Sequence, residues 1–168
     1  LFPVSRLSAL ASVVYKRQVS ALPNVVATLE GSSGHGKPVW RSVSVDDYDG
    51  TKLRSGEPLE DVMGCVDRAD ALLVNCATPE AVTMAVDVIK GCGKPFGAYA
   101  NGFTEITQSF VQVGATVQEL SARTDLTPAA YADFAEDWAQ MGATIIGGCC
   151  EVGPAHIRGN RAAADLTS

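Results

Sequence analysis

The chain lacks the features that mark several other classes of protein. Among its 168 residues, no stretch reaches the roughly 18 consecutive apolar residues that a membrane-spanning helix needs. The first residues do not show the order of a signal peptide, in which basic residues precede an apolar core. The 13 basic and 19 acidic residues form no long runs of one sign, which argues against a nucleic-acid surface. We therefore expect one soluble domain that acts on small molecules.

Two loops contain part of a known ligand motif but lack the rest of it. The glycine-rich segment from Gly31 to Pro38 has no Gly-Lys-Ser/Thr ending, so a plain connection is favoured over a phosphate-binding loop. Residues 46–50, Asp-Asp-Tyr-Asp-Gly, place three carboxylates together. They have neither the spacing nor the distal glutamate of a calcium loop, so we interpret them as a solvated turn.

The cysteines are the most informative residues of the chain. Their number is odd, five, and two are adjacent, which is a poor framework for disulfides. We expect free or metal-bound thiols in the reducing cytoplasm. Cys149 and Cys150 follow an apolar segment and two glycines, and Cys76 follows a second apolar segment. Cys65 and Cys92 are expected to be packing or incidental thiols.

Strand-like and helix-like patterns alternate from about residue 38 onward. Expected strands cover residues 39–45, 71–75, 95–99 and 144–147, and expected helices cover residues 58–67, 79–90 and 128–141, with a last one from Pro154. This alternation predicts an α/β fold of parallel strands joined by crossover helices. Either a doubly wound sheet or part of a (β/α)₈ barrel satisfies it, and four strands alone cannot close such a barrel.

Two stretches fall outside this alternation. Within residues 1–26, Leu7, Leu10 and Val14 recur near helical spacing, so an amphipathic helix is possible, but no strand is recognisable there. Residues 101–127 are polar and contain glycine, which predicts a long loop over the strand ends.

The thiols are expected at one edge of the sheet, because the carboxyl ends of parallel strands meet there. Three thiolates, from Cys76, Cys149 and Cys150, can then converge on one metal ion. From the residues alone, core packing and metal binding are equally good interpretations of these cysteines. His156 lies near a helix start, where a surface role at the helix end is favoured over metal ligation.

Four short segments together resemble the homocysteine S-methyltransferase family. They are Val-Asn-Cys at residues 74–76, Tyr-Ala-Asn-Gly at 99–102, Gly-Gly-Cys-Cys at 147–150 and Pro-Ala-His-Ile at 154–157. Their order and spacing match the family as well, and the resemblance runs from about residue 37 to 158.

The resemblance implies a fold, a cofactor and an activity. The family has a (β/α)₈ barrel that holds one Zn²⁺ ion through a cysteine after the sixth strand and a cysteine pair after the eighth. Those positions are Cys76, Cys149 and Cys150 here. The implied reaction is methyl transfer from a small-molecule donor to the homocysteine thiol, giving methionine. Asn75 and Asn101 are candidate substrate-binding residues, although asparagine at a strand end also serves as an ordinary turn former.

The chain also departs from the family pattern. It supplies only the fifth to eighth strands, so we expect the C-terminal half of a TIM barrel that is truncated at its N-terminus, and marginal stability. We divide its single domain into an atypical segment 1–36, a barrel portion 37–158 and a tail 159–168. The acidic residues that bind the substrate amino group in the family's N-terminal half have no counterpart. After the cysteine pair, Glu-Val-Gly at 151–153 replaces the family's Gly-Thr-Thr.

Three functions are compatible with these observations. The first is a zinc-dependent homocysteine methyltransferase, whose donor the sequence does not identify. The second is a noncatalytic barrel fragment or zinc-binding module that a partner chain completes, either a second copy or a complementing N-terminal half. The third is a thiol redox protein that uses Cys149 and Cys150. It is disfavoured, because a disulfide between adjacent cysteines closes a strained eight-membered ring.

Overall fold

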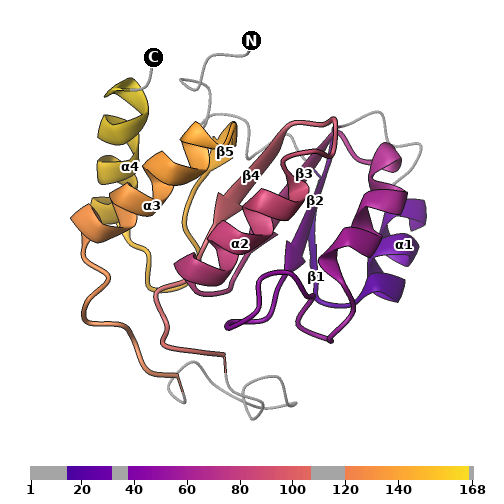
Figure 1. Cartoon of the computed structure of the whole chain (residues 1–168), viewed down its shortest axis with the longest axis horizontal. Helices are drawn as coiled ribbons and strands as arrows, with labels where there is room; N and C mark the ends of the chain where they lie inside the picture. The colour runs from indigo at the N-terminus through magenta and orange to yellow at the C-terminus, as the bar shows by residue number, and fades with distance from the viewer. Residues whose placement is uncertain (1–14, 32–37, 107–119, 167–168) are drawn as a thin grey trace.

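The fold is built on one parallel sheet, seen in a computed structural model that describes residues 15–31, 38–106 and 120–166 (Figure 1). The strands are β1 (Tyr15–Val19), β2 (Val39–Ser44), β3 (Ala71–Asn75), β4 (Phe96–Tyr99) and β5 (Ile145–Ile146). The helices are α1 (Leu22–Gly31), the 3₁₀ helix η2 (Leu59–Arg68), α2 (Pro79–Ile89), α3 (Pro128–Gln140) and α4 (Pro154–Leu166). In these described ranges, no helix has the length and apolar character needed to cross a membrane.

The strands lie side by side in the order in which they occur in the chain. All four pairings are parallel, with Val43 opposite Val74 and Val74 opposite Ala98. Crossovers between parallel strands are almost always right-handed, so sequential order places the connecting helices on one face of the sheet. Figure 1 shows α2 lying across the front of β3 and β4, both of which it contacts. This is the arrangement of a barrel wall, and it excludes the doubly wound alternative.

The hydrophobic core lies between the sheet and its helices. Every residue of β3 is buried, and alternation along the strand sends Leu72 and Val74 into the core. On the helix side, the rings of Tyr131 and Trp138 pack edge to face with their centroids 5.8 Å apart. The indole N–H of Trp138 donates to the hydroxyl of Thr83 at 2.8 Å, which joins α3 to α2. The helices that cover the sheet are therefore joined to one another.

The N-terminal segment contains a βα unit, so the expectation that no strand is present there is wrong. Residues Tyr15 to Val19 pair with β2 along their whole length, and α1 follows directly. The sequence Tyr-Lys-Arg-Gln-Val has no apolar alternation, because this strand lies at the edge of the described sheet, where charged residues are common. The helix expected from Leu7, Leu10 and Val14 falls on residues that lie outside the described ones.

Two further elements lie where they are expected but differ in helix type or in length. Residues 59–68 form a 3₁₀ helix rather than a regular α-helix, and Gly64 at its middle lowers the α-helical propensity. The last strand has two residues rather than four. Its hydrogen bonding to β4 nevertheless continues, because the amide of Gly147 donates to Ala98 at 3.0 Å.

The two loops singled out in the sequence are only partly described. Residues 32–37 of the glycine-rich connection and 107–119 of the long loop lie outside the described residues. The ends of the long loop pair with each other through a bridge between Phe103 and Ala122. These ends lie next to the carboxyl end of β4, and the expectation of a loop over the strand ends stays a prediction for the residues between them.

Gly97 is needed for β4 and β5 to pack together. A Cβ atom at this position would lie 1.9 Å from the carbonyl oxygen of Ile145, far inside van der Waals contact. We expect Gly97→Ala to lower the free energy of unfolding by about 3 kcal/mol, because the strands must move apart. Gly91→Ala is the control, since a Cβ there would meet nothing within 4 Å. Urea denaturation followed by circular dichroism measures both, and equal midpoints would contradict the prediction.

Candidate metal centre

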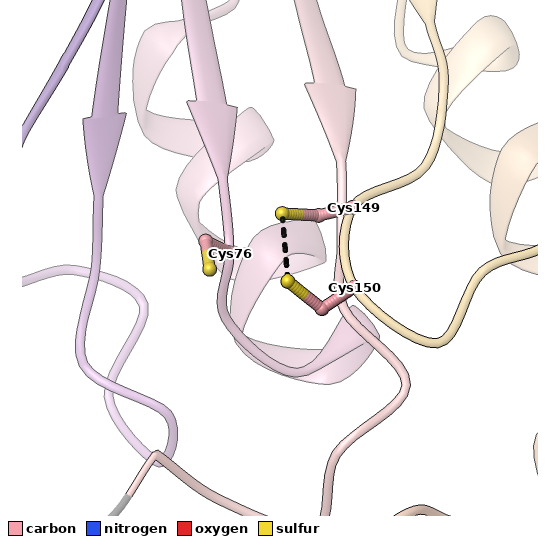
Figure 2. Close-up of side chains that lie close together, drawn as sticks. All are labelled: Cys76, Cys149 and Cys150. Carbon is pink, nitrogen blue, oxygen red and sulfur yellow. Dashed lines mark hydrogen bonds between the residues drawn. The ribbon is translucent and has the colours of Figure 1, made fainter. Parts of the chain in front are cut away.

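Three cysteine sulfurs meet at the carboxyl edge of the sheet. The Sγ atoms of Cys76, Cys149 and Cys150 all lie within 4.8 Å of one another. Those of the adjacent pair are 3.9 Å apart (Figure 2). Cys76 directly follows β3, whereas the pair follows β5, and Figure 2 shows the pair reaching toward the strand end that carries Cys76. The structure thus brings together the three thiols that the sequence predicted as metal ligands.

The continuation of β4 holds both ligand-bearing segments. On one side, the amide of Cys76 donates to the carbonyl of Tyr99 at 3.3 Å. On the other, the amide of Cys149 donates to Ala100 at 2.9 Å, and the carbonyl of Cys150 accepts from the amide of Gly102 at 2.9 Å. Since β4 lies between β3 and β5, these bonds fix the spacing of the thiols through backbone rather than through side chains.

Both cysteine turns contain a residue in the left-handed backbone region. The φ angle is +55° at Cys76 and +63° at Glu151, the residue after the pair. Side chains other than glycine adopt this region at a cost of about 1–2 kcal/mol. Such backbone strain is kept where the surrounding structure holds it in place. The glycine that the family pattern places at position 151 is explained by this conformation.

The Cys149 thiol resists ionisation in the absence of a metal ion. A hydrogen bond with Cys76, burial and charge on Cys76 all raise the pKa of Cys149 above its ordinary value. Thiolates this close repel one another, and a divalent cation between them removes that penalty and favours their deprotonated form.

The donor set fits a zinc ion. Zinc prefers tetrahedral sulfur ligation with Zn–S distances near 2.3 Å, which places sulfur atoms about 3.8 Å apart. The measured 3.9 Å between the Cys149 and Cys150 sulfurs agrees with that spacing. In the described part of the chain, this is the single group of three or more cysteine, histidine or acidic side chains close enough to share a metal. Cys65 and Cys92 lie elsewhere and pack against the hydrophobic core, as expected.

Asn75 and Asn101 lie beside the cluster, and each has a polar atom without a partner. The side-chain oxygen of Asn75 accepts from the hydroxyl of Ser42 at 2.9 Å, and that of Asn101 accepts from the amide of Phe103 at 3.0 Å. Both side chains are 0% exposed. Their amide nitrogens have no hydrogen-bond partner among the described residues. The turn-forming role of Asn101 is thus real, and it engages the side-chain oxygen but not the NH₂ group.

His156 lies outside the thiol cluster, as expected, but it is half-buried rather than on the surface. Its Nδ1 accepts from the amide of Gly153 at 3.1 Å, and its Nε2 lies 3.1 Å from the carbonyl oxygen of Leu126. Both ring nitrogens are therefore engaged at the start of α4, and the side chain is not part of the thiol cluster.

Two residues of the site were missed in the sequence. Asp47 is buried and forms an ion pair with Arg54, so the interpretation of residues 46–50 as a solvated turn is wrong for this carboxylate. Tyr48 in the same turn is 73% exposed, in agreement with that interpretation. The position of Asp47 in the chain could have indicated that it belongs to the site, because it follows β2 at the same sheet edge as the cysteines. Arg54 lies in a loop excursion after β2 that no sequence pattern marked.

The chain matches a family model and curated proteins over most of its length. A family model described as homocysteine S-methyltransferase matches residues 7–164. Homocysteine S-methyltransferase 4 of Zea mays is 30% identical over 142 residues, which cover 80% of this chain and 38% of that protein. Selenocysteine methyltransferase of Astragalus bisulcatus is 25% identical over 126 residues, covering 73% of this chain and 35% of that protein.

Solved structures show the same fold. The oxidized form of the homocysteine methyltransferase MmuM from Escherichia coli superposes with a TM-score of 0.66 at 22% identity, over 96% of this chain and 53% of that one. Its metallated form gives 0.65 at 24% identity, over 97% and 49%. The chain therefore spans about half the length of the solved relatives that it matches, and less of the curated ones.

The sequential parallel sheet and the thiols at its carboxyl edge define a protein of the (β/α)-barrel class, with a candidate thiolate metal centre. Within that class, the extent of the family match shows that the chain belongs to the homocysteine S-methyltransferase family. The resemblance carried by the four short segments is confirmed.

The strain at Glu151 predicts a stabilising substitution. We expect Glu151→Gly to raise the free energy of unfolding by about 0.5–1 kcal/mol, because relief of the left-handed strain exceeds the added flexibility of the unfolded chain. Glu151→Ala keeps the strain and is expected to give no increase. Thermal unfolding of the three proteins decides between these results, and a stabilising alanine would show that the side chain, not the backbone, is unfavourable.

Proposed function

We propose that the chain is the zinc-binding portion of a methyltransferase that transfers a methyl group to the thiol of homocysteine to give methionine. The observation that carries the proposal is the convergence of Cys76, Cys149 and Cys150 within 4.8 Å at the carboxyl edge of a barrel wall. Three protein ligands are the pattern of a catalytic zinc site, in which the fourth position is left for substrate. The named activities of the maize and E. coli relatives are in accord with it.

The chain's own residues provide a preorganised set of sulfur donors. Backbone bonds from the β4 continuation fix their spacing before any metal binds, so little ordering is required on binding. A zinc ion held there would withdraw charge from an incoming thiol and favour its nucleophilic thiolate at neutral pH. Such thiolate chemistry needs a reducing environment, so we place the protein in the cytoplasm.

The unpaired amides of Asn75 and Asn101 are proposed to bind the acceptor amino acid. A buried donor without a partner costs about 1–3 kcal/mol, and a ligand that accepts its hydrogen bond removes that cost. A carboxylate accepts several such bonds and is the part of homocysteine that an amide NH₂ group suits. Asn75 immediately precedes Cys76, and the backbone amide of Asn101 donates to the carbonyl of Ala77 at 3.0 Å. Both residues thus flank the thiol cluster.

The open edges of the sheet support a second candidate function. The described sheet has five strands and leaves β1 and β5 at its edges, so the chain is also suited to be a zinc-binding module that another chain completes, whether a second copy or a complementing N-terminal half. In that case the methyl donor would be bound largely outside this chain.

Measuring the zinc content tests both proposals against the alternative that the chain no longer binds zinc. We expect about one zinc ion per chain after purification under reducing conditions, measured by inductively coupled plasma mass spectrometry. Cys76→Ser and Cys149→Ser should each lose most of it, because each removes one of three ligands. Cys92→Ser, which removes a thiol outside the cluster, should keep it.

The same preparations are then assayed for methyl transfer to homocysteine with S-methylmethionine, S-adenosylmethionine, betaine and methylfolate as donors. Transfer that depends on Cys76 supports the enzyme. Zinc binding without transfer favours the module. A parent protein without zinc would overturn both.

The asparagine proposal predicts selective loss of affinity for ligands that carry a carboxylate. We expect Asn75→Ala to weaken homocysteine binding to the zinc-loaded chain by about tenfold or more, as a lost hydrogen bond to a charged group implies. Binding of propane-1-thiol, which offers only the sulfur, should be unchanged. Asn160→Ala is the matched control, since it removes another buried, unpaired amide from α4. Isothermal calorimetry measures the affinity of the parent and of both variants for each ligand, and equal weakening of both thiols by Asn75→Ala would contradict a carboxylate contact.

A further inference from the structure

We propose that Arg54 and Asp47 are positioning residues that set the metal affinity of the thiol cluster, acting through the main chain of Cys76. The inference rests on the proposed zinc site and assigns a role to two residues outside its ligands.

Arg54 connects a buried carboxylate to the backbone of a ligand. Its Nη1 and Nη2 atoms donate to the two carboxylate oxygens of Asp47 at 3.1 and 3.3 Å. Nη2 also donates to the carbonyl oxygen of Cys76 at 2.8 Å. The side chains are only 16% and 4% exposed, so this contact is shielded from solvent. The planar, forked guanidinium can make these bonds together, which the single ammonium of a lysine cannot match.

Asp47 in turn joins the loops that follow three successive strands. It lies after β2, and its carboxylate accepts from the amide of Thr78, after β3, at 3.2 Å. It also accepts from the amide of Ile106, after β4, at 2.6 Å. The hydroxyl of Thr78 donates to the main-chain oxygen of Asp47 at 2.7 Å. With the two bonds from Arg54, the carboxylate has four donors, so its charge is fully compensated and its position is fixed.

The backbone of Cys76 is where this network reaches the metal site. The residue adopts φ = +55°, a conformation that an L-residue leaves readily unless neighbouring contacts hold it. Its amide is held by Tyr99 and its carbonyl by Arg54, so both ends of the residue are fixed. The direction of the Cα–Cβ bond, and with it the thiol, follows from that backbone conformation. Loss of the Arg54 contact would let Cys76 relax away from the pair.

The contact is tested by measuring metal affinity in a double-mutant cycle of Arg54→Met and Cys76→Ser. Zinc affinity is obtained by competition with a chromophoric chelator. We expect Arg54→Met to weaken zinc binding by about 10–100-fold in the parent, the usual effect of residues that orient metal ligands. In the Cys76→Ser background it should change the affinity by less than about threefold, because the ligand through which it acts is gone. Asp47→Asn should follow the same pattern.

Two further variants keep the result interpretable. Arg123→Met is the control, because Arg123 is also 16% exposed and pairs with Glu80 and Asp125 away from the thiols. It should leave zinc affinity unchanged. Arg54→Lys retains the charge and should restore part of the affinity. In the cobalt-substituted protein, Arg54→Met should weaken the thiolate-to-cobalt charge-transfer band while the Arg123→Met spectrum matches the parent.

The inference and the proposed function fail in different ways. A parent chain that binds no zinc overturns the proposed function. A parent that binds zinc with the same affinity as Arg54→Met overturns only the positioning role. Equal weakening by Arg54→Met in the presence and absence of the Cys76 thiol also overturns it, because the effect would then come from general destabilisation.

Discussion

The hydrogen bonding of β4 to both of its neighbours is the constraint on which the candidate site depends. Cys76 and the cysteine pair are more than 70 residues apart in the sequence, yet each is bonded to the same short segment, residues 99–102, which comprises the last residue of β4 and the three that follow it. The parallel register brings the strand ends to one edge, and Gly97 lets β5 approach closely enough to complete the cluster. The spacing of the sulfurs is thus a property of the sheet.

Much of the fold could be predicted from the sequence, in those elements whose burial determines the order of apolar and polar residues. The strand at residues 71–75 is buried on both faces and is apolar up to its terminal Asn75, and α2 and α3 begin with a threonine cap followed by proline. The strand at Tyr15–Val19 could not be found, because its conformation is set by pairing with β2 rather than by its own residues. The choice between barrel and doubly wound sheet likewise depended on strand order, which periodicity does not contain.

The part of the site that could be predicted consists of residues whose type alone indicates their chemistry. Cysteines at strand ends are conspicuous, and their convergence is found as expected. Asp47 was misread because a run of three carboxylates beside glycine has the composition of an exposed turn, whereas the burial of one of them depends on an arginine seven residues later. The unpaired amide nitrogens of Asn75 and Asn101 could not be inferred either, since the sequence does not show which polar atoms lack a hydrogen-bond partner in the folded chain.

The Asp47 carboxylate also bears on how this sheet edge can vary. In (β/α) barrels the loops after successive strands are usually independent modules, so that one can lengthen or be exchanged without its neighbours. Here one side chain bonds the loops after β2, β3 and β4. Insertions are therefore tolerable only beyond the points of attachment at residues 47, 78 and 106, and a loop transplanted from a relative must bring its attachment amide with it. We therefore expect this face to change in a coordinated way, with several loops altered together rather than one at a time.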